Sequence, residues 1–218
     1  MKSNKCVIVG AGELCLSDIK SHIKLDKQDF CIAADGGLTY LSDMGILPDL
    51  IIGDMDSLED KCLLSEQYSD IMIKKLPVEK DDTDMLAAIK EGLSRGHKFF
   101  EIYGALGGRL DHTIANIQCL KFLDNHNAKG ILYGKDLQIE LICNNKVNYL
   151  KEKHKKGKRI SVFAFGDDAH GVTEKGLKYE LENAVISQDF PIGVSNEFIG
   201  DDSMIEVKDG TLLIFIEL

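Results

Sequence analysis

Phe30-Cys31-Ile32-Ala33-Ala34-Asp35-Gly36-Gly37 (residues 30–37) is the stretch of sequence that decides the fold. A short apolar run ends abruptly in an acid and two glycines. The run predicts a strand, and Asp-Gly-Gly predicts a tight turn at the carboxyl end of that strand. The same pattern recurs at residues 6–9, 50–52, 99–103 and 128–133, where a glycine follows each apolar run.

Segments with helical spacing lie between these runs. The clearest covers residues 83–95, with Thr83 or Asp82 as the expected N-cap and Gly96 as the residue that ends the helix. Strands that alternate with helices predict βαβ units, and therefore an α/β fold with a mostly parallel sheet flanked by helices. In such sheets, ligands bind beyond the carboxyl ends of the strands.

The chain changes character after about residue 135, where the helical period fades. Apolar segments at residues 137–143, 159–165, 184–186, 204–208 and 211–217 alternate with turn-like pieces, which predicts a C-terminal antiparallel β-sandwich. Asp209-Gly210 predicts a two-residue hairpin turn. The basic run 151–159 is expected to cap another hairpin as a solvated loop, with an anion site as the alternative. The expected domains are 1–136 and 137–218.

Composition excludes several classes of function. Hydrophobic residues make up 44% and charged residues 28% of the 218, as in an ordinary globular protein. The 26 Lys and Arg against 36 Asp and Glu give a net charge of −10, which argues against a nucleic-acid or anionic-membrane partner. No run approaches the roughly 18 apolar residues of a membrane span. The six cysteines are scattered without a C-x-x-C pair, so we expect reduced thiols and a cytoplasmic protein.

Four acidic motifs in the first half each follow a predicted strand or precede a predicted helix. They are Ala34-Asp35-Gly36-Gly37, Gly53-Asp54-Met55-Asp56-Ser57, Lys80-Asp81-Asp82-Thr83-Asp84 and Gly107-Gly108-Arg109-Leu110-Asp111-His112. In a parallel sheet all four converge on one rim. Converging carboxylates repel one another, so a fold that gathers them normally needs a cation, and hard oxygen ligands select Mg²⁺, Mn²⁺ or Ca²⁺. Asp54 and Asp56 could share that metal.

Gly107-Gly108-Arg109 supplies the complementary groups for a phosphate. Two glycines let a backbone approach closely, the arginine is a forked and permanently charged donor, and a helix expected near Asp111 adds its N–H groups. Together with the carboxylates this predicts a Mg²⁺–polyphosphate site. No Walker-type motif is present, and Gly10-Ala11-Gly12 is only a weak dinucleotide signal because Cys15 stands where a third glycine belongs.

Six motifs, in this order and spacing, resemble those of the thiamine pyrophosphokinase family. Four of them are the acidic motifs above, and the second of these extends to Leu-Pro-Asp-Leu-Ile-Ile-Gly-Asp-Met-Asp-Ser (47–57). The other two are Gly-Leu-Lys-Tyr (176–179) and Gly-Val-Ser-Asn-Glu-Phe (193–198). The resemblance implies an ATP- and Mg²⁺-binding α/β domain over 1–136, a thiamine-binding β-sandwich over 137–218, and a homodimer with active sites at the subunit interface. It also implies transfer of the pyrophosphoryl group of ATP to the hydroxyl of thiamine, giving thiamine diphosphate and AMP.

The resemblance also implies roles for individual residues. Asp54, Asp56 and Asp84 match the acidic positions around Mg²⁺ and the phosphates, and Tyr179 stands where some relatives carry Trp. The predicted catalytic residues are Asp54, Asp56, Asp84, Arg109 and Asp111. The predicted ATP-binding residues are Asp35, Gly36, Gly37, Thr83, Gly107, Gly108, His112 and Asn116. The predicted thiamine-binding residues are Tyr179, Ser195 and Asn196.

Three other functions stay open on the residues alone. A related pyrophosphokinase would act on a different hydroxymethyl heterocycle, such as a pterin. A metal-dependent phosphohydrolase would use water in place of the alcohol and break down nucleotide without an acceptor. A thiamine or nucleotide sensor would bind its ligand without turnover.

Overall fold

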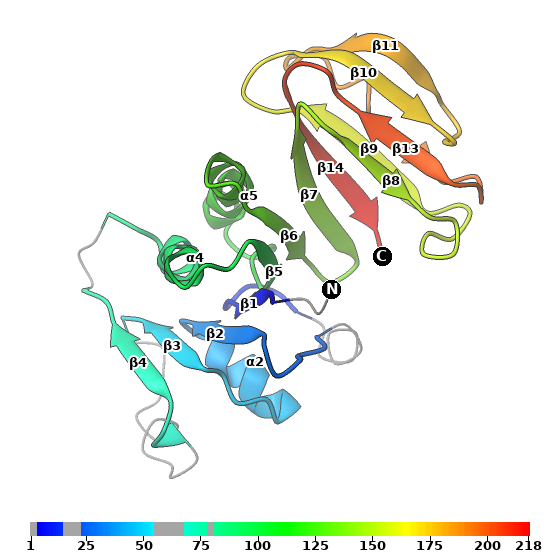
Figure 1. Ribbon diagram of the computed structural model, residues 1–218. Helices are drawn as coiled ribbons and strands as arrows, with labels where there is room; N and C mark the ends of the chain where they lie inside the picture. Colours follow the sequence, from blue (N-terminus) through cyan, green and yellow to red (C-terminus); the bar gives the residue numbers. More distant parts are fainter. Residues whose placement is uncertain (1–3, 15–22, 55–67, 78–80) are drawn as a thin grey trace. The chain divides into compact units, whose positions relative to one another are not determined.

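The computed structural model describes residues 4–14, 23–54, 68–77 and 81–218, and it divides into two compact units, Met1–Lys135 and Asp136–Leu218 (Figure 1). Each unit has its own architecture. None of the described helices is both long and apolar enough to cross a membrane.

The first unit is built on a parallel sheet, as the alternating pattern predicts. Its described strands run in the order β6-β5-β1-β2-β3-β4, and every pairing between them is parallel. The strands are β1 (Cys6–Val9), β2 (Phe30–Ala34), β3 (Leu50–Gly53), β4 (Met72–Lys75), β5 (Phe99–Tyr103) and β6 (Lys129–Tyr133). The described helices are α2 (Gly37–Met44), α4 (Asp84–Ser94) and α5 (Leu110–Asn125).

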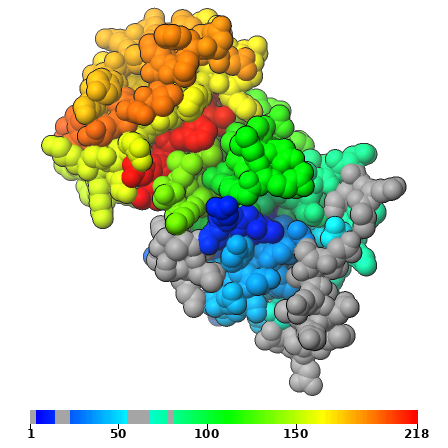
Figure 2. All heavy atoms as spheres, turned by 180° about the vertical axis from the view of Figure 1, so that it is seen from behind, coloured from blue at the N-terminus to red at the C-terminus, as the bar shows by residue number. Residues whose placement is uncertain are grey.

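The helices cover both faces of this sheet (Figure 1). Val7 and Val9 of β1 point to the face that packs on α2, in a core that includes Leu38 and Leu41. The opposite face carries α4, which lies so close that a Cβ on Gly92 would stand 2.6 Å from the Phe100 ring. In Figure 2 the dark-blue residues near the start of the described chain lie between green α5 and the lighter blue of β2 and α2.

Helix α4 begins and ends where the sequence predicts. The Thr83 hydroxyl accepts a hydrogen bond from the Leu86 N–H (3.1 Å), which makes Thr83 the N-cap. Gly96 follows the helix with φ +88°. Strand β4 was not predicted, because its four residues are all exposed at the sheet edge and form no buried apolar run.

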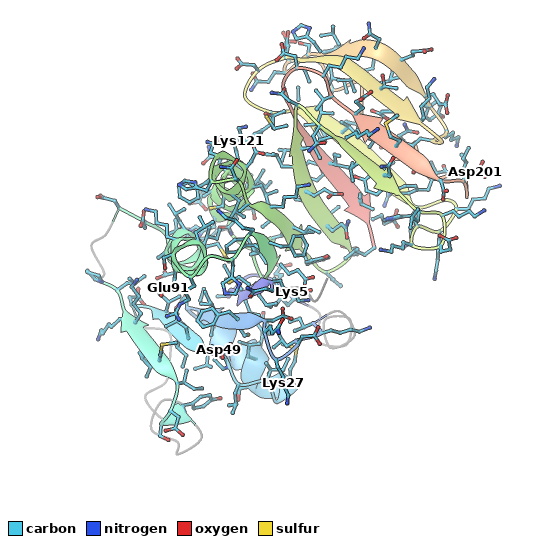
Figure 3. All side chains as sticks on the ribbon, viewed as in Figure 1. Lys5, Lys27, Asp49, Glu91, Lys121 and Asp201 are labelled. Carbon is cyan, nitrogen blue, oxygen red and sulfur yellow. The ribbon has the colours of Figure 1, made fainter. Side chains whose placement is uncertain are left out.

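Strand order also defines where a ligand should bind. From β1 the chain builds outward through β2, β3 and β4 on one side, and later through β5 and β6 on the other. The order therefore reverses between β1 and β5, and this reversal is the topological switch point at which α/β sheets open a crevice. At the amino ends of the strands, Asp29 accepts the Lys5 N–H and Asp49 accepts the Cys31 N–H. Lys5 and Asp49 are labelled in Figure 3.

The second unit is the predicted antiparallel β-sandwich. One sheet has the order β12-β9-β14-β7 and the other β11-β10-β13-β8. Their inward side chains form one core that includes Ile160, Val172, Phe198, Ile205 and Ile214. The strands are β7 (Leu137–Cys143), β8 (Lys146–Tyr149), β9 (Arg159–Ala164), β10 (Ala169–Lys175), β11 (Leu181–Ile186), β12 (Asn196–Glu197), β13 (Ser203–Glu206) and β14 (Thr211–Glu217).

Both predicted hairpins are wrong. Asp209-Gly210 joins β13 to β14, which lie in different sheets, and the basic run 151–159 joins β8 to β9, which also lie in different sheets. The Gly210 N–H donates to Asn144 Oδ1 (2.8 Å), and the Asn144 N–H donates back to the Gly210 carbonyl (3.1 Å). The turn residues mark a change of direction, but they do not determine whether the next strand pairs locally or crosses to the facing sheet.

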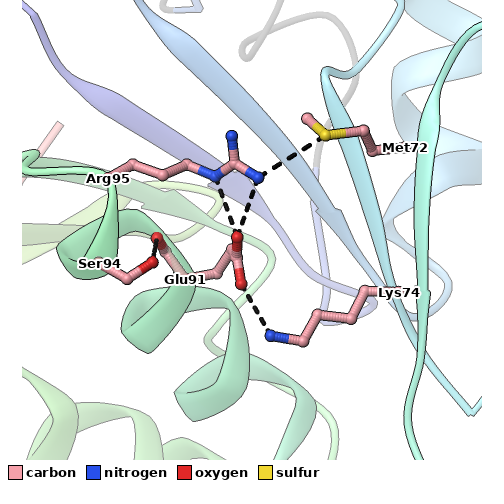
Figure 4. A network of polar contacts seen from close by, with 5 residues as sticks. All are labelled: Met72, Lys74, Glu91, Ser94 and Arg95. Carbon is pink, nitrogen blue, oxygen red and sulfur yellow. Dashed lines mark hydrogen bonds and ion pairs between the residues drawn. The ribbon is translucent and has the colours of Figure 1, made fainter.

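Edge strand β4 is tied to α4 by a polar network (Figure 4). The Glu91 carboxylate accepts from Lys74 Nζ (2.8 Å) and from Arg95 Nε (3.0 Å), and its side chain is only 15% exposed. The hydrogen bond from Lys74 is the main reason that the pKa of Glu91 lies below its ordinary value. The network holds the edge of the sheet through charge rather than through apolar burial.

We expect Glu91→Gln to lower the free energy of unfolding by about 1 kcal/mol at pH 7. Because the folded pKa of Glu91 is depressed, this stabilisation is present above the pKa of the unfolded chain. It is lost as pH falls through the folded pKa, so the variant and the parent should converge in acid. Urea unfolding followed by circular dichroism measures both effects. Asp124→Asn, which breaks an i,i+3 pair with Lys121 on α5, is the control, with an effect below about 0.5 kcal/mol.

Candidate active site

A cavity of about 370 Å³ opens at the switch point of the parallel sheet. Its walls come from the segments that follow β1, β2 and β5 and from the first turns of α4 and α5. The lining residues are Gly10, Ala11, Gly12, Ala34, Asp35, Thr83, Asp84, Met85, Gly104, Ala105, Gly107, Gly108, Arg109, His112 and Asn116. Eight of the residues predicted for ATP binding and catalysis are therefore brought together in one cavity.

The wall between β1 and β5 is made of backbone. The Gly10 N–H donates to the Tyr103 carbonyl and the Gly12 N–H to the Gly104 carbonyl, both at 2.8 Å. A Cβ on Gly104, whose φ is +63°, would stand 2.2 Å from the Gly10 carbonyl oxygen. A Cβ on Gly12 would stand 2.6 Å from the Gly104 carbonyl oxygen. No side chain fits between these two segments.

This glycine wall gives only a weak signal in the sequence. Gly10-Ala11-Gly12 is a weak motif alone, and Gly104 looks like an ordinary turn after a strand. The switch point is what identifies them together. Because β1 and β5 are parallel neighbours, the first glycine after β1 and the first glycine after β5 must lie side by side.

Acidic residues stand at the carboxyl ends of neighbouring strands and at a helix start. Asp35 directly follows β2 with φ +50°, and Asp54 directly follows β3. A Cβ on Gly53 would stand 3.2 Å from the Asp35 Cα, so the two turns pack together. Asp84 is the first residue of α4 and lines the cavity.

Other predicted acidic and glycine positions do not line the cavity themselves. Asp54, Asp111, Gly36 and Gly37 are not among its lining residues, and Asp56 lies outside the described residues. Gly37 instead serves packing, because a Cβ there would stand 1.9 Å from the Val9 carbonyl oxygen. Among the described residues, no three His, Cys, Asp or Glu side chains form a group able to hold a metal ion.

The loop before α5 offers an open backbone and a cation. Gly108 has φ +63° with open space where a Cβ would stand, and its N–H donates to Glu13 Oε1 (3.1 Å). Arg109 donates two hydrogen bonds to Asp111, from Nε to Oδ1 at 3.2 Å and from Nη2 to Oδ2 at 2.6 Å. Each partner stabilises the charge of the other, which raises the pKa of Arg109 and lowers that of Asp111. A phosphate that binds Arg109 must compete with Asp111 for the exposed guanidinium.

Two residues of α5 complete the wall in different ways. Asn116 is buried, and its Nδ2 donates to the Ala105 carbonyl (2.7 Å), so it holds the loop after β5 in place. His112 is exposed and lines the cavity. The side chain of Asn116 therefore positions backbone, whereas His112 is exposed where it lines the cavity.

The residues predicted for thiamine lie in the second unit, with very different exposure. Tyr179 is 63% exposed, whereas Asn196 is 4% exposed. Asn196 Nδ2 donates to the Tyr179 carbonyl (2.7 Å), and its Oδ1 accepts from the Tyr179 N–H (3.0 Å). Ser195 is exposed with φ +63°, a conformation that is uncommon for a residue with a side chain, and its N–H donates to Ser161 Oγ.

Glu174 lies directly behind this segment and was not predicted. It is 1% exposed on β10, and its Oε2 accepts from Asn196 Nδ2 (2.9 Å). Burial raises its pKa to about 7, partly offset by the hydrogen bond from Asn196. The sequence signal was available but faint, since Glu174 occupies an inward position of its strand, like Val172.

A glycine-walled crevice at a switch point, with acidic residues, an arginine and a separate antiparallel sandwich, defines a two-domain α/β protein of the phosphate-binding type. The family model "Thiamin pyrophosphokinase, catalytic domain" matches residues 22–132, and "Thiamin pyrophosphokinase, vitamin B1 binding domain" matches residues 146–212. The chain therefore belongs to the thiamin pyrophosphokinase family of enzymes.

Individual relatives match most of the chain. Thiamine pyrophosphokinase of Bacillus subtilis is 28% identical over 207 residues, which covers 95% of each chain. The crystal structure of thiamine pyrophosphokinase from Bacillus subtilis superposes with a TM-score of 0.87 over 98% of each chain at 27% identity. Thiamine pyrophosphokinase 1 of rice is 25% identical and covers 88% of this chain and 80% of the relative.

We expect Gly104→Ala to destabilise the protein by about 3 kcal/mol or more and to close the cavity, because the new Cβ meets the Gly10 carbonyl. Gly45→Ala is the matched control. Gly45 has φ +71° but open space around it, so its replacement adds only backbone strain, about 1 kcal/mol. Thermal unfolding compares the two, and equal losses would contradict the steric explanation.

Glu174 should make stability depend on pH. Its pKa is about 7 in the fold and 4.5 ordinarily. Between pH 4.5 and pH 7 the folded chain therefore keeps a proton on Glu174 that the unfolded chain has lost. The free energy of unfolding should therefore fall as pH rises from about 4.5 to about 7, by up to about 3 kcal/mol relative to Glu174→Gln. Urea unfolding of both proteins across this range measures the difference. A constant difference would show that Glu174 ionises normally.

Proposed function

We propose that this chain transfers the pyrophosphoryl group of ATP to the hydroxyl of thiamine, giving thiamine diphosphate and AMP. The observation that carries the proposal is the cavity at the switch point, where backbone glycines, Asp35, Asp84 and Arg109 meet within a chain that matches both family domains. ATP would occupy this cavity in the first unit, and thiamine would bind in the second, around Tyr179, Ser195 and Asn196.

The phosphates of ATP would lie against backbone rather than side chains. Gly10, Gly12 and Gly104 leave that wall without side chains, so phosphate oxygens can approach it closely. The first turns of α4 and α5 border the same cavity, and the N–H groups of a helix start favour an anion. Arg109 would exchange its hydrogen bonds to Asp111 for bonds to a phosphate.

We propose Asp54, Asp56 and Asp84 as the residues that hold Mg²⁺, with Asp35 and Asp111 as further acidic groups near the phosphates. The donor chemistry fits, since Mg²⁺ is normally bound by one or two carboxylates with substrate phosphates and water rather than by an all-protein cage. When bound, the ion would neutralise phosphate charge.

The chain's own groups then account for the transfer. The hydroxyl oxygen of thiamine forms a bond to the β-phosphorus, the bond from that phosphorus to the α-phosphate oxygen breaks, and AMP leaves. The hydroxyl proton passes to a carboxylate at the rim of the cavity. Thiamine is a cation, so a chain with a net charge of −10 attracts it. The exposed Tyr179 ring offers it an aromatic face.

We also propose a homodimer with active sites at the subunit interface. The second unit exposes apolar side chains that a second copy could cover. They are Tyr179, Val185, Phe190, Ile192 and Val194. We assign the reaction to the cytoplasm, which is consistent with the free thiols of the four described cysteines, Cys6, Cys31, Cys119 and Cys143.

The deciding assay incubates the purified protein with ATP, Mg²⁺ and thiamine and resolves the products by chromatography. We expect AMP and thiamine diphosphate in equal amounts, dependent on all three components. ADP with thiamine monophosphate would mean attack on the terminal phosphorus. Nucleotide breakdown without thiamine would favour a phosphohydrolase, and product only from a hydroxymethyl pterin would favour the related pyrophosphokinase. Thermal stabilisation by ligand without any product would favour a sensor.

Asp84→Asn should lower kcat at least about 100-fold with little change in thermal stability, since it removes one rim carboxylate while keeping the side-chain size. Asp82→Asn is the control, because Asp82 pairs with Lys90 and does not line the cavity. Near-normal turnover by Asp84→Asn would remove Asp84 from the catalytic site.

A further inference from the structure

Glu174 is the most deeply buried ionisable carboxyl group of the second unit, and the reaction proposed above does not use it. It points into the sandwich core from β10, with 1% exposure. Its Oε1 is buried without a hydrogen-bond partner among the described residues. A core position filled by a carboxyl is costly, so the group requires an explanation beyond packing.

The hydrogen bond that the Glu174 carboxyl accepts leads to the surface. Its Oε2 accepts from Nδ2 of Asn196, which is itself buried on β12. The same Asn196 amide bonds both backbone groups of Tyr179, accepting its N–H at 3.0 Å and donating to its carbonyl at 2.7 Å. The carboxyl therefore orients an amide, and the amide fixes the backbone of one exposed residue.

Exposed groups surround this buried pair. The Tyr179 ring is 63% exposed, and Ser195, which precedes Asn196, holds the left-handed backbone conformation at the surface. The Asn196 side chain makes four hydrogen bonds within the fold, the fourth accepted from the Glu197 N–H. With its amide so occupied, Asn196 acts by holding its neighbours rather than by reaching a substrate.

We propose that Glu174 is a positioning residue for thiamine binding: from the core it orients the Asn196 amide, and this amide holds Tyr179 in place at the surface. The inference deepens the proposed function, on which it rests. Burial raises the pKa of Glu174 to about 7, so the carboxyl is neutral in the fold over much of the acid range and can sit beside apolar side chains. A neutral isostere should therefore serve the same role.

The test compares thiamine and ATP kinetics in two Glu174 variants. Glu174→Met removes the acceptor of the Asn196 bond and should raise the KM for thiamine roughly tenfold, about the effect of one lost hydrogen bond. The KM for ATP should change less than about twofold, since the ATP cavity lies in the other unit. Glu174→Gln keeps an acceptor at this position and should restore the KM for thiamine to within about twofold of the parent.

Ser203→Ala is the matched control. Ser203 is also buried in the same sheet, and its Oγ also lacks a hydrogen-bond partner among the described residues, so its hydroxyl does not support Tyr179. It should leave both KM values unchanged. If Glu174→Met fails to fold, Glu174→Asp replaces it, because the shorter side chain withdraws the carboxyl from Asn196 and should raise the KM for thiamine in the same way.

The possible outcomes distinguish failure of the positioning role from failure of the proposed function. A parent protein that makes no thiamine diphosphate would refute the proposed function. An active parent whose folded Glu174→Met or Glu174→Asp variant keeps its KM for thiamine would overturn the positioning role and leave Glu174 as a stability determinant. Equal rises in the KM for thiamine and for ATP would also overturn it.

Discussion

Backbone contact between the segments after β1 and β5 is the constraint on which the first unit depends. Two hydrogen bonds, from Gly10 to Tyr103 and from Gly12 to Gly104, draw these segments together at the point where the strand order reverses. The approach is possible only because neither segment carries a Cβ at the points of contact. Everything else at the rim follows from it: the cavity opens there, its wall presents amide and carbonyl groups, and α4 and α5 begin beside it. In the proposed function, the close approach of phosphate to this wall depends on the exclusion of side chains before any charged residue contributes.

The two units hold their proposed site residues in place by different physical means. In the first, position is set by close packing of glycines and strand ends, which leaves little freedom. In the second, an exposed tyrosine is held by a buried polar pair, Glu174 and Asn196, whose hydrogen bonds are strong because water is excluded from them. Steric contact suits a ligand as uniform as a polyphosphate. A hydrogen-bonded support suits recognition of one particular organic molecule, because small changes in the support can retune the surface above it.

Much of this arrangement could be predicted from the sequence, because local signals and global topology agree. The apolar runs that end in Gly or Asp located five of the six described parallel strands, and Thr83 and Gly96 located both ends of α4. Strand β4 was missed because its residues are exposed, and the other failures came where the deciding interaction is distant in sequence. The prediction of a turn at Asp209-Gly210 was correct, but the prediction of a hairpin was wrong. The sheet that β14 joins depends on packing in the core and not on the turn residues. Glu174 was missed because its partner Asn196 lies 22 residues away and neither residue is unusual by itself.

The exchange of hydrogen bonds between Asn144 and Gly210 has a consequence for how the sandwich is made. These residues are 66 positions apart, and β14 lies between β7 and β9 in its sheet. The first sheet of the sandwich therefore lacks the strand that joins β7 to β9 until residues 211–217 have been synthesised, although β7 and β9 are synthesised much earlier. Until then, both strands expose unpaired edges and apolar faces, the state in which nascent chains aggregate or need a chaperone. The order of the strands along the chain therefore places the completion of this sheet at the end of the chain's synthesis.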